Sequence, residues 1–341
     1  MKNYVISMYN KGQNEAGPKA KVDAEDFLAQ ENFDKVNFYF SGARKAKLLS
    51  VKQRLWDIPQ KLKQINPELV VFQYPTFDSS TDQAIISNLK KHTKAKIVYL
   101  IHDIESLRAY RGDVSYTKQE IDFLNQSDGL IVHNTKMAAW LSENGVKKTM
   151  VQLEIFDYHN PVPLQKNRLY EGSICYAGNL QKADFLQKLT LKHPLALYGP
   201  NQAATYPENI TYQGSFTPEE LPTKLVQNFG LIWDGTSITE CDGSFGEYLK
   251  YNDPHKTSLY LSSGLPVIIW KKAALADFVS ENNVGLCVDS LAELDGILST
   301  LTPQEYQEMC TNAQNIAKKM RTGTYLKTAV AKISQLIEVE K

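Results

Sequence analysis

One short predicted helix carries the residues best suited to bind an anion. Asp253 is its expected N-cap, because a side-chain oxygen can accept from free helix amides, and Pro254 suits the first helical position. His255 and Lys256 follow beside those amides, and Gly264 is expected to end the helix. Free N–H groups, the positive end of the helix dipole and an ammonium group suit a phosphate or diphosphate. The alternative interpretation is a capped surface helix with a solvated lysine.

Three predicted strand ends in the same half of the chain bear glycine. Such a glycine alone more often marks a tight turn, but together with the helix start these ends look like a nucleotide-diphosphate site. Lys182 opens the helix expected at 182–189, after the first of them, and Tyr198 could stack on a base. The three strand ends read Ala177-Gly178-Asn179, Tyr198-Gly199-Pro200 and Trp233-Asp234-Gly235.

A second group of reactive side chains follows the predicted strand 96–101. His102, Asp103 and Glu105 lie there with two arginines downstream, which makes a candidate general-base cluster. The alternative is a capped turn with Asp103 paired to an arginine. Gly17 lies in a predicted polar loop, which either faces the ligand or is a plain connector. His133 and Asn134 follow the next strand and could face the same cleft.

Alternating strands and helices must position these side chains. Apolar runs of four to six residues alternate with helical patterns in both halves, which predicts parallel sheets covered on both faces. The stretch 156–172 has the weakest pattern, so the domains are predicted as 1–155, 156–325 and a C-terminal helix 326–341 packing back on the first domain. Two doubly wound domains leave a cleft at the carboxyl ends of their strands. The predicted strands are 4–8, 36–40, 69–73, 96–101 and 129–133, then 173–177, 195–198, 210–212, 231–233 and 265–270.

Composition narrows the function classes. The 341 residues include 38 basic and 38 acidic side chains, so the formal net charge is zero, which argues against a general nucleic-acid binder. The four cysteines form no CxxC pair, and no DxD or HxxxH motif occurs, so no metal is expected. The N-terminal sequence lacks the apolar region of a signal peptide, and no run is long enough to span a membrane. These features predict a cytoplasmic protein.

Five segments resemble one bacterial glycosyltransferase family of the GT-B fold. That family includes β-1,6-galactofuranosyltransferases and the glucosyltransferase-3-type enzymes that extend O-glycans on serine-rich repeat adhesins. The likeness spans nearly the whole chain, and its most specific part runs from 233 to 266. The segments are VVFQYP (70–75), IHDIESLR (101–108), YAGNLQKADFL (176–186), FGLIWDG (229–235) and GSFGEYLKYNDPHKTSLYLSSGLPVI (243–268).

The resemblance implies two Rossmann-like domains, with a UDP-sugar donor bound by the C-terminal one and a GlcNAc-type glycan acceptor near the N-terminal one. Lys256, Thr257 and Ser258 would contact the diphosphate, and Lys182 matches a position where some relatives carry arginine. Neither a metal nor another cofactor is expected. Relatives self-associate, so a homo-oligomer is possible.

The resemblance also bears on mechanism. Many retaining GT-B enzymes carry two glutamates at positions that here are Tyr251 and Leu259, which favours an inverting reaction. Asp103 is the first expected base, followed by Glu105 and His102. Replacing Lys256 with alanine is expected to weaken UDP binding while fold stability hardly changes.

Three alternative functions stay open on the sequence. One is a β-galactofuranosyltransferase that uses UDP-galactofuranose in cell-surface polysaccharide synthesis. Another is a non-catalytic sugar- or nucleotide-binding partner subunit. A nicotinamide-dependent oxidoreductase is disfavoured, because no glycine-rich dinucleotide fingerprint occurs.

Overall fold

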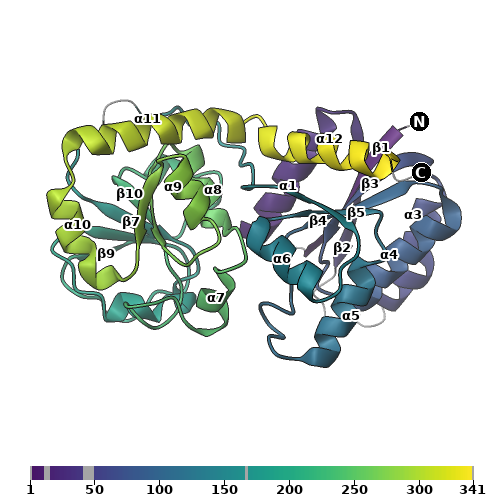
Figure 1. Cartoon of the computed structure of the whole chain (residues 1–341), viewed down its shortest axis with the longest axis horizontal. Helices are drawn as coiled ribbons and strands as arrows, with labels where there is room; N and C mark the ends of the chain where they lie inside the picture. Colours follow the sequence, from purple (N-terminus) through teal and green to yellow (C-terminus); the bar gives the residue numbers. More distant parts are fainter. Residues whose placement is uncertain (1, 11–15, 41–49, 166–167, 340–341) are drawn as a thin grey trace. The chain divides into compact units, whose positions relative to one another are not determined.

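The structure is a computed structural model that describes residues 2–10, 16–40, 50–165 and 168–339. The chain divides into two compact units, each shown in Figure 1. The N-terminal unit comprises Met1–Leu153 with Tyr325–Lys341, and the C-terminal unit comprises Glu154–Thr324. The sequence had placed these divisions at 155/156 and 325/326.

The N-terminal unit contains a parallel sheet of six described strands in the order β2-β1-β3-β4-β5-β6. Its central strands are buried almost throughout, which is why they appear in the sequence as continuous apolar runs. The strands are β1 (Lys2–Asn10), β2 (Phe33–Phe40), β3 (Pro67–Tyr74), β4 (Lys96–Ile101), β5 (Gly129–Val132) and β6 (Thr149–Gln152). The helices are α1 (Ala16–Ala29), η1 (Gln53–Asp57), α3 (Ile58–Leu62), α4 (Ser79–His92), α5 (Val114–Leu124), α6 (Thr135–Glu143) and α12 (Thr324–Val339).

Two sequence expectations fail in this unit. The edge strand β6 was missed, because it is short and only one of its four residues is buried. The predicted polar loop before residue 19 is wrong at its end: α1 already begins at Ala16, so Gly17 lies in the first turn of a helix.

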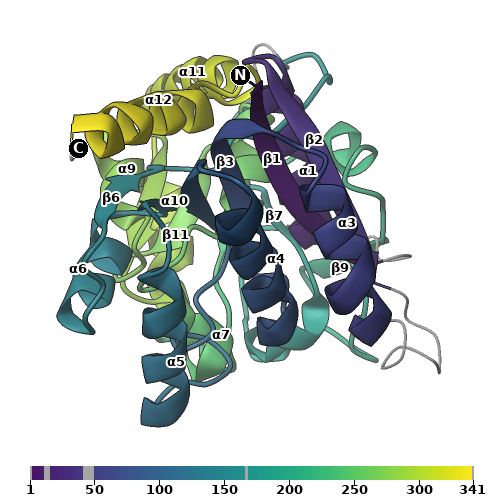
Figure 2. The same ribbon diagram turned by 90° about the vertical axis from the view of Figure 1, so that its right-hand side faces the viewer.

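The C-terminal helix α12 packs on the N-terminal unit. A Cβ added at Gly129, the first residue of β5, would lie 2.9 Å from the Cδ1 of Ile333 on α12. The helix therefore approaches the start of β5 closely. Figure 2 shows α12 at one end of the N-terminal unit. Lys327 adds a hydrogen bond of 2.8 Å from its Nζ to the side-chain oxygen of Gln30.

The C-terminal unit repeats the architecture, with six described parallel strands in the order β12-β11-β10-β7-β8-β9. Strand β12 and helix α7 were missed, and the helix predicted for 182–189 is two short 3-10 turns. The strands are β7 (Ile174–Ala177), β8 (Leu195–Tyr198), β9 (Ile210–Gly214), β10 (Phe229–Ile232), β11 (Val267–Trp270) and β12 (Gly285–Val288). The helices are η2 (Leu180–Lys182), η3 (Asp184–Gln187), η4 (Leu221–Lys224), α7 (Gly243–Tyr248), α8 (His255–Ser262), α9 (Ala276–Glu281), η5 (Leu291–Glu293), α10 (Leu294–Thr300) and α11 (Pro303–Met320).

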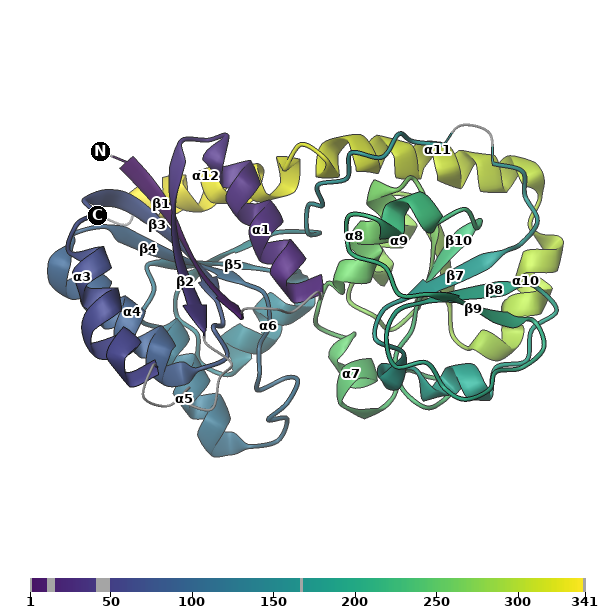
Figure 3. The same ribbon diagram turned by 180° about the vertical axis from the view of Figure 1, so that it is seen from behind.

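Helix α8 is set deep in this unit, against β10, β11 and α11 (Figure 3). Tyr260 on α8 lies so close to β10 that a Cβ at Gly230 would stand 2.2 Å from its ring. Its hydroxyl accepts a hydrogen bond of 2.6 Å from the backbone N–H of Ala177, at the end of β7. One buried tyrosine therefore fixes α8 relative to two neighbouring strands.

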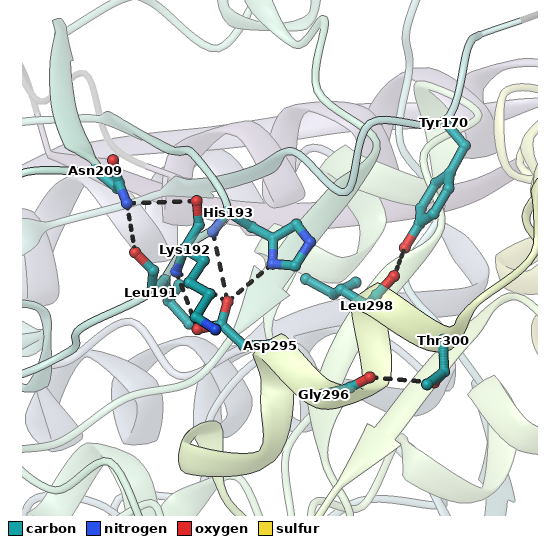
Figure 4. Close-up of polar contacts among 9 residues, drawn as sticks. All are labelled: Tyr170, Leu191, Lys192, His193, Asn209, Asp295, Gly296, Leu298 and Thr300. Atoms are coloured by element: carbon teal, nitrogen blue, oxygen red, sulfur yellow. Dashed lines mark hydrogen bonds and ion pairs between the residues drawn. The ribbon is translucent and has the colours of Figure 1, made fainter.

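A polar contact outside the sheet ties α10 to the loop before β8 (Figure 4). Asp295 accepts hydrogen bonds of 3.0 Å from the Lys192 backbone N–H and 2.8 Å from the Nδ1 of His193. These donors hold the pKa of the Asp295 carboxyl below its ordinary value, against the opposing effect of burial.

Both sheets reverse their strand order at one point. The reversal lies between β1 and β3 in the N-terminal unit and between β7 and β10 in the C-terminal unit. Ligands of doubly wound sheets bind outside the carboxyl ends of the strands at such points. The two reversals therefore indicate where functional side chains should be sought.

Two further findings concern the chain as a whole. The four cysteines are free thiols, and three of them are buried. Within the residues that the structure describes, no helix has the length and apolar character needed to cross a membrane.

Candidate active site

Three side chains meet at the strand reversal of the C-terminal unit. Tyr176 comes from β7, Asp234 follows β10, and Lys256 stands in the first turn of α8. The Nζ of Lys256 lies 2.7 Å from Asp234 Oδ1, 3.1 Å from the Tyr176 hydroxyl and 3.4 Å from the Trp233 carbonyl oxygen. The Tyr176 hydroxyl donates to the same Asp234 oxygen at 2.8 Å. The ammonium is therefore held from three sides.

This ion pair is largely removed from solvent. The side chains of Lys256 and Asp234 are 13% and 11% exposed. Burial raises the pKa of Tyr176 well above its ordinary value, so its hydroxyl stays protonated and can donate to Asp234. An ammonium has three donors, and all three have a partner here. The result is a positive charge in a fixed position beside the start of α8.

The start of α8 differs in detail from the expectation. Its N-cap is Pro254, with no side-chain capping bond, so the prediction that Asp253 caps the helix is wrong. Asp253 is instead a buried residue one position earlier. Thr257 and Ser258 are also buried, and the Thr257 hydroxyl oxygen has no hydrogen-bond partner in the described part of the chain. The first turn thus presents backbone amides and an unsatisfied hydroxyl.

Two more basic side chains lie within this unit. The Nζ of Lys182, at the end of η2, stands 4.1 Å from the ring centroid of Phe245 on α7. The His255 ring opens α8, with its centroid 5.0 Å from that of Tyr158. Aromatic rings therefore flank both side chains.

The loops after β7 and β8 contact each other through their backbones. A Cβ at Gly199 would stand 1.9 Å from the Gly178 carbonyl oxygen, and Gly199 has φ +134°, so only glycine fits there. Asn179 accepts from the Gln181 N–H at 3.1 Å and from the Asn201 side chain at 2.9 Å. The Asn179 side-chain oxygen thus shapes the loop.

Tyr198 does not fit the proposed role in base stacking. It is buried, and its hydroxyl donates to the Lys224 carbonyl at 2.9 Å. Its ring lies beside that of Phe216, with centroids 6.2 Å apart. The expectation of an exposed stacking face is wrong, because the end of β8 is covered by the chain that follows β9.

The strand reversal of the N-terminal unit holds a different set. Gln73 of β3 is fully buried and donates from Nε2 to the Ser7 hydroxyl of β1 at 2.6 Å and to the Lys21 carbonyl of α1 at 3.0 Å. Its oxygen lies 2.7 Å from the Nε2 of His102, directly after β4. Side chains from two strands thus meet at the reversal, and His102 lies just after the end of the next strand.

The two carboxylates after His102 share one arginine. Arg108 Nη1 stands 3.6 Å from Asp103 Oδ2, and Arg108 Nε donates to Glu105 at 3.0 Å. Asp103 is thus paired with an arginine, as the alternative interpretation expected, and the general-base role of this cluster stays a prediction. Burial raises the pKa of Glu105, and the neighbouring Arg108 opposes that shift.

A buried carboxylate that the sequence did not single out holds this turn. Glu120 on α5 accepts from the N–H groups of Glu105 at 3.0 Å and Ser106 at 2.8 Å. It also accepts from the Tyr74 hydroxyl at 2.8 Å. Glu120 therefore orients the segment that carries the candidate bases.

The other strand-end pair is structural. His133 is buried, its Nε2 lies 3.1 Å from the Ile101 carbonyl, and burial lowers its pKa to about 4. Asn134 caps α6 by accepting from the Met137 N–H at 3.0 Å. Neither residue acts as an exposed acid or base.

The family comparisons cover most of the chain. Residues 2–155 match the model of the glucosyltransferase 3-like N-terminal domain, and residues 174–333 match that of the C-terminal domain. The chain belongs to the glucosyltransferase 3-like family. The resemblance inferred from the sequence motifs is thereby confirmed.

Individual relatives agree with this assignment. The chain is 34% identical to the β-1,6-galactofuranosyltransferase WbbI of Escherichia coli K12 over 97% of this chain and 98% of that protein. It is 27% identical to glucosyltransferase 3 of Streptococcus gordonii over 99% of each. The trehalose-6-phosphate structure from E. coli bound with UDP-2-fluoro glucose superposes with TM-score 0.60 at 11% identity, covering 98% of this chain and 99% of that chain.

These findings confirm the GT-B fold and the enzyme class. This member of the glucosyltransferase 3-like family is a hexosyltransferase. The alternatives of an oxidoreductase and of a non-catalytic subunit have no support among these matches.

The sequence pointed to only part of each side-chain cluster. Lys256, Asp234 and His102 were marked because each follows or precedes a recognisable strand or helix end. Tyr176, Gln73 and Glu120 were not, because a buried polar residue inside an apolar strand or helix has no local signal of its partner. Gln73 and Tyr176 are each the second-last residue of their strand. Their placement near the carboxyl end of a strand was the available clue.

Proposed function

We propose that the protein transfers a hexose, glucose or N-acetylglucosamine, from a UDP-sugar to a GlcNAc-type glycan with inversion. O-glycans of a serine-rich repeat adhesin are the proposed acceptors. The observation that carries the proposal is the buried Lys256–Asp234–Tyr176 cluster beside the first turn of α8. It supplies a fixed cation where a diphosphate would leave.

The donor would bind through its diphosphate at the start of α8. The longest Lys256 contact, 3.4 Å to the Trp233 carbonyl, is the one that a phosphate oxygen would most easily replace. The unsatisfied Thr257 hydroxyl and the backbone amides of the first turn would supply further donors. Groups already oriented toward a developing charge stabilise it without reorganisation. The remainder of the donor site would be lined by Gly178, Asn179, Lys182 and His255. The solved structure that is bound with UDP-2-fluoro glucose supports a nucleotide sugar as the class of ligand.

The reaction would proceed without a metal. In the residues that the structure describes, no group of three or more His, Cys, Asp or Glu side chains could hold an ion. Lys256, together with Lys182 of the same unit, would neutralise the departing phosphate instead.

Acceptor activation is proposed at the end of β4, where Asp103, Glu105 and His102 lie. One of them takes the proton of the acceptor hydroxyl, whose oxygen attacks the anomeric carbon from the face opposite UDP. The name of the E. coli relative specifies a β product. A β product formed from an α-linked nucleotide sugar requires inversion, which supports the single-displacement reaction.

A second donor is favoured by one observation. Identity to the galactofuranosyltransferase is 34%, against 27% to the S. gordonii glucosyltransferase. UDP-galactofuranose is therefore the alternative donor, with a cell-surface polysaccharide as acceptor.

A donor panel tests the proposal. UDP-glucose, UDP-GlcNAc, UDP-galactofuranose and UDP-galactopyranose are each incubated with a GlcNAc-bearing peptide, and the product is identified by mass and by the NMR coupling of its anomeric proton. Transfer of glucose or GlcNAc with a β linkage supports the first proposal. Transfer from UDP-galactofuranose alone supports the second, and UDP-galactopyranose is its matched control. An α-linked product would overturn inversion.

A further inference from the structure

We propose that the exposed ring of Phe77 is the acceptor subsite of the N-terminal unit, where it stacks on the terminal pyranose of the acceptor glycan. The inference rests on the proposed transfer reaction and names the residue that positions its acceptor. Phe77 lies between β3 and α4, just beyond the strand end at which the sheet order reverses. Ligands of doubly wound sheets bind at such a place.

Phe77 combines exposure with a backbone conformation that a bulky residue rarely adopts. The residue is 56% exposed, and its φ is +64°, in the left-handed region that favours glycine and asparagine. A single exposed aromatic side chain needs no explanation by itself. Backbone strain is different, because it costs free energy and clusters at binding and catalytic sites. The two features together, at the carboxyl end of a central strand, indicate a ligand contact.

The backbone that leads to Phe77 is fixed by two buried side chains. The Nζ of Lys21, on α1, donates to the Pro75 carbonyl at 2.8 Å. Asp82, on α4, accepts from the Thr76 N–H at 3.0 Å. Little backbone ordering is therefore needed when a ligand contacts the ring, and this preorganisation favours binding.

Two cations stand near the Phe77 ring, and one of them belongs to the candidate base cluster. The Lys21 Nζ lies 5.5 Å from the ring centroid, and the Arg108 Cζ lies 5.4 Å from it. The same Arg108 contacts the carboxylates of Asp103 and Glu105. The ring is thus placed beside the cluster at which the acceptor hydroxyl is proposed to lose its proton.

The chemistry of this surface fits a neutral sugar. Lys21 is only 5% exposed and the Arg108 side chain 24%, so the ring offers more open surface than either cation. The face of an aromatic ring is electronegative and attracts the C–H bonds of a pyranose. In β-linked GlcNAc, one face carries the axial hydrogens H1, H3 and H5, and the other carries only H2 and H4. The first face is the more apolar and is the one assigned to Phe77.

Saturation-transfer NMR tests the contact without reference to activity. The full chain is prepared with protonated aromatic residues in a deuterated background, and methyl β-N-acetylglucosaminide is the probe. Irradiation of the aromatic protons should transfer saturation mainly to H1, H3 and H5 of the sugar. Phe77→Leu should lose most of this signal, and Phe77→Tyr should keep it.

A matched control removes another exposed ring of the same unit. Trp56 is 65% exposed, and Trp56→Leu should leave the saturation transfer unchanged. Three results would overturn the proposal: no transfer in the wild type, equal transfer to both faces of the sugar, or an unchanged signal in Phe77→Leu.

Kinetics and unfolding distinguish a binding role from a structural one. Phe77→Leu should raise the acceptor KM by roughly tenfold, because a stacking contact is lost, while UDP affinity stays near wild type. Phe77→Asn should raise the acceptor KM similarly, yet its urea unfolding midpoint should stay near wild type, since asparagine tolerates the left-handed conformation. A lower midpoint with an unchanged KM would show that the ring serves the fold and not the acceptor.

The outcomes separate this inference from the proposed function. If the wild type transfers no hexose from any donor, the function fails, while the NMR contact is still decided by its own measurement. If the wild type is active and Phe77→Leu keeps the wild-type acceptor KM, the subsite is wrong and the transfer reaction stands.

Discussion

The two sheets reverse their strand order at equivalent points, but the side chains gathered there differ in charge. In the C-terminal unit an ammonium is held by a carboxylate and a phenol, in the Lys256–Asp234–Tyr176 cluster. In the N-terminal unit an imidazole contacts an uncharged amide, in the His102–Gln73 pair. In both units the contacting residues come from different elements of the fold, and a buried residue, Asp234 or Gln73, is one of the partners.

The difference matches the two tasks of a glycosyl transfer. A leaving diphosphate needs a permanent positive charge, and an ion pair keeps Lys256 in place before the ligand arrives. A base must change its charge during the reaction. A neutral partner orients such a group without fixing its protonation state, whereas a carboxylate in its place would bias the ring toward the cation.

The largest expected effect tests the charged side of this comparison. Lys256→Ala should weaken UDP binding by roughly 30-fold, because a desolvated charge partner is removed. It should also destabilise the fold by about 3 kcal/mol, since Asp234 is left buried without its cation. The sequence had suggested almost no loss of stability, and the buried pair is the reason for the revision.

Calorimetry with UDP and urea unfolding measure these two effects. Uridine, which lacks phosphate, should bind the variant almost as well as the wild type. Lys271→Ala is the matched control, because Lys271 pairs with Asp289 on the surface, and its stability should stay near wild type. Unchanged stability and UDP binding in Lys256→Ala would remove the charged half of the comparison.

The next effect tests whether the N-terminal unit keeps a buried imidazole neutral. Burial lowers the pKa of His133 from 6.5 to about 4, so the unfolded chain binds more protons between these values. His133 therefore contributes stability above pH 6.5 that is lost as pH falls toward 4. The advantage of wild type over His133→Asn should shrink by up to about 3 kcal/mol across that range.

Urea unfolding of both proteins at several pH values provides this measurement. Asp82, whose pKa burial raises to about 7, changes stability in the opposite direction but is present in both proteins and cancels in the difference. If the stability difference between wild type and His133→Asn did not change with pH, His133 would titrate normally, and the carboxyl end of the N-terminal sheet would not exclude charge.

A smaller effect is expected for the carboxylate beside Arg108. If Glu105 or His102 is the base, Asp103→Asn should keep kcat within about tenfold of wild type, because only an ion-pair partner is lost. Steady-state kinetics with UDP calorimetry measure this. A fall of roughly 10²-fold at unchanged UDP affinity would return the base to Asp103. The N-terminal unit would then also use a charged, ion-paired group, as the C-terminal unit does with Lys256.

No effect is expected from metal removal. If Lys256 is the cation that neutralises the leaving phosphate, EDTA should leave the transfer rate unchanged. Dialysed enzyme is assayed with EDTA and then with added Mn²⁺ or Mg²⁺. A loss of activity that either ion restores would mean that a metal, not lysine, supplies the charge.

Much of the fold could be predicted from the sequence, because buried parallel strands produce local apolar runs. The strands at Lys96–Ile101 and Leu195–Tyr198 coincide with the predicted bounds. Prediction failed for short elements such as β12, with one buried residue of four, and for 182–189, where backbone contacts to Gly235 divide the segment into 3-10 turns.

The family and the fold class were determined by the sequence itself, because sequence motifs and the alternation of apolar runs with helical patterns are local. The partners of the reactive side chains were decided only by the tertiary structure. Lys256 contacts Asp234, which is 22 residues away in the sequence, and Tyr176, which is 80 residues away. Gln73 and His102 are separated by 29 residues. Strand order brings these residues together, and no periodicity along the chain encodes which strand lies beside which. The same physical fact explains why the sequence did not reveal that Lys256, predicted there as a diphosphate ligand, is also a buried ion-pair partner in the fold.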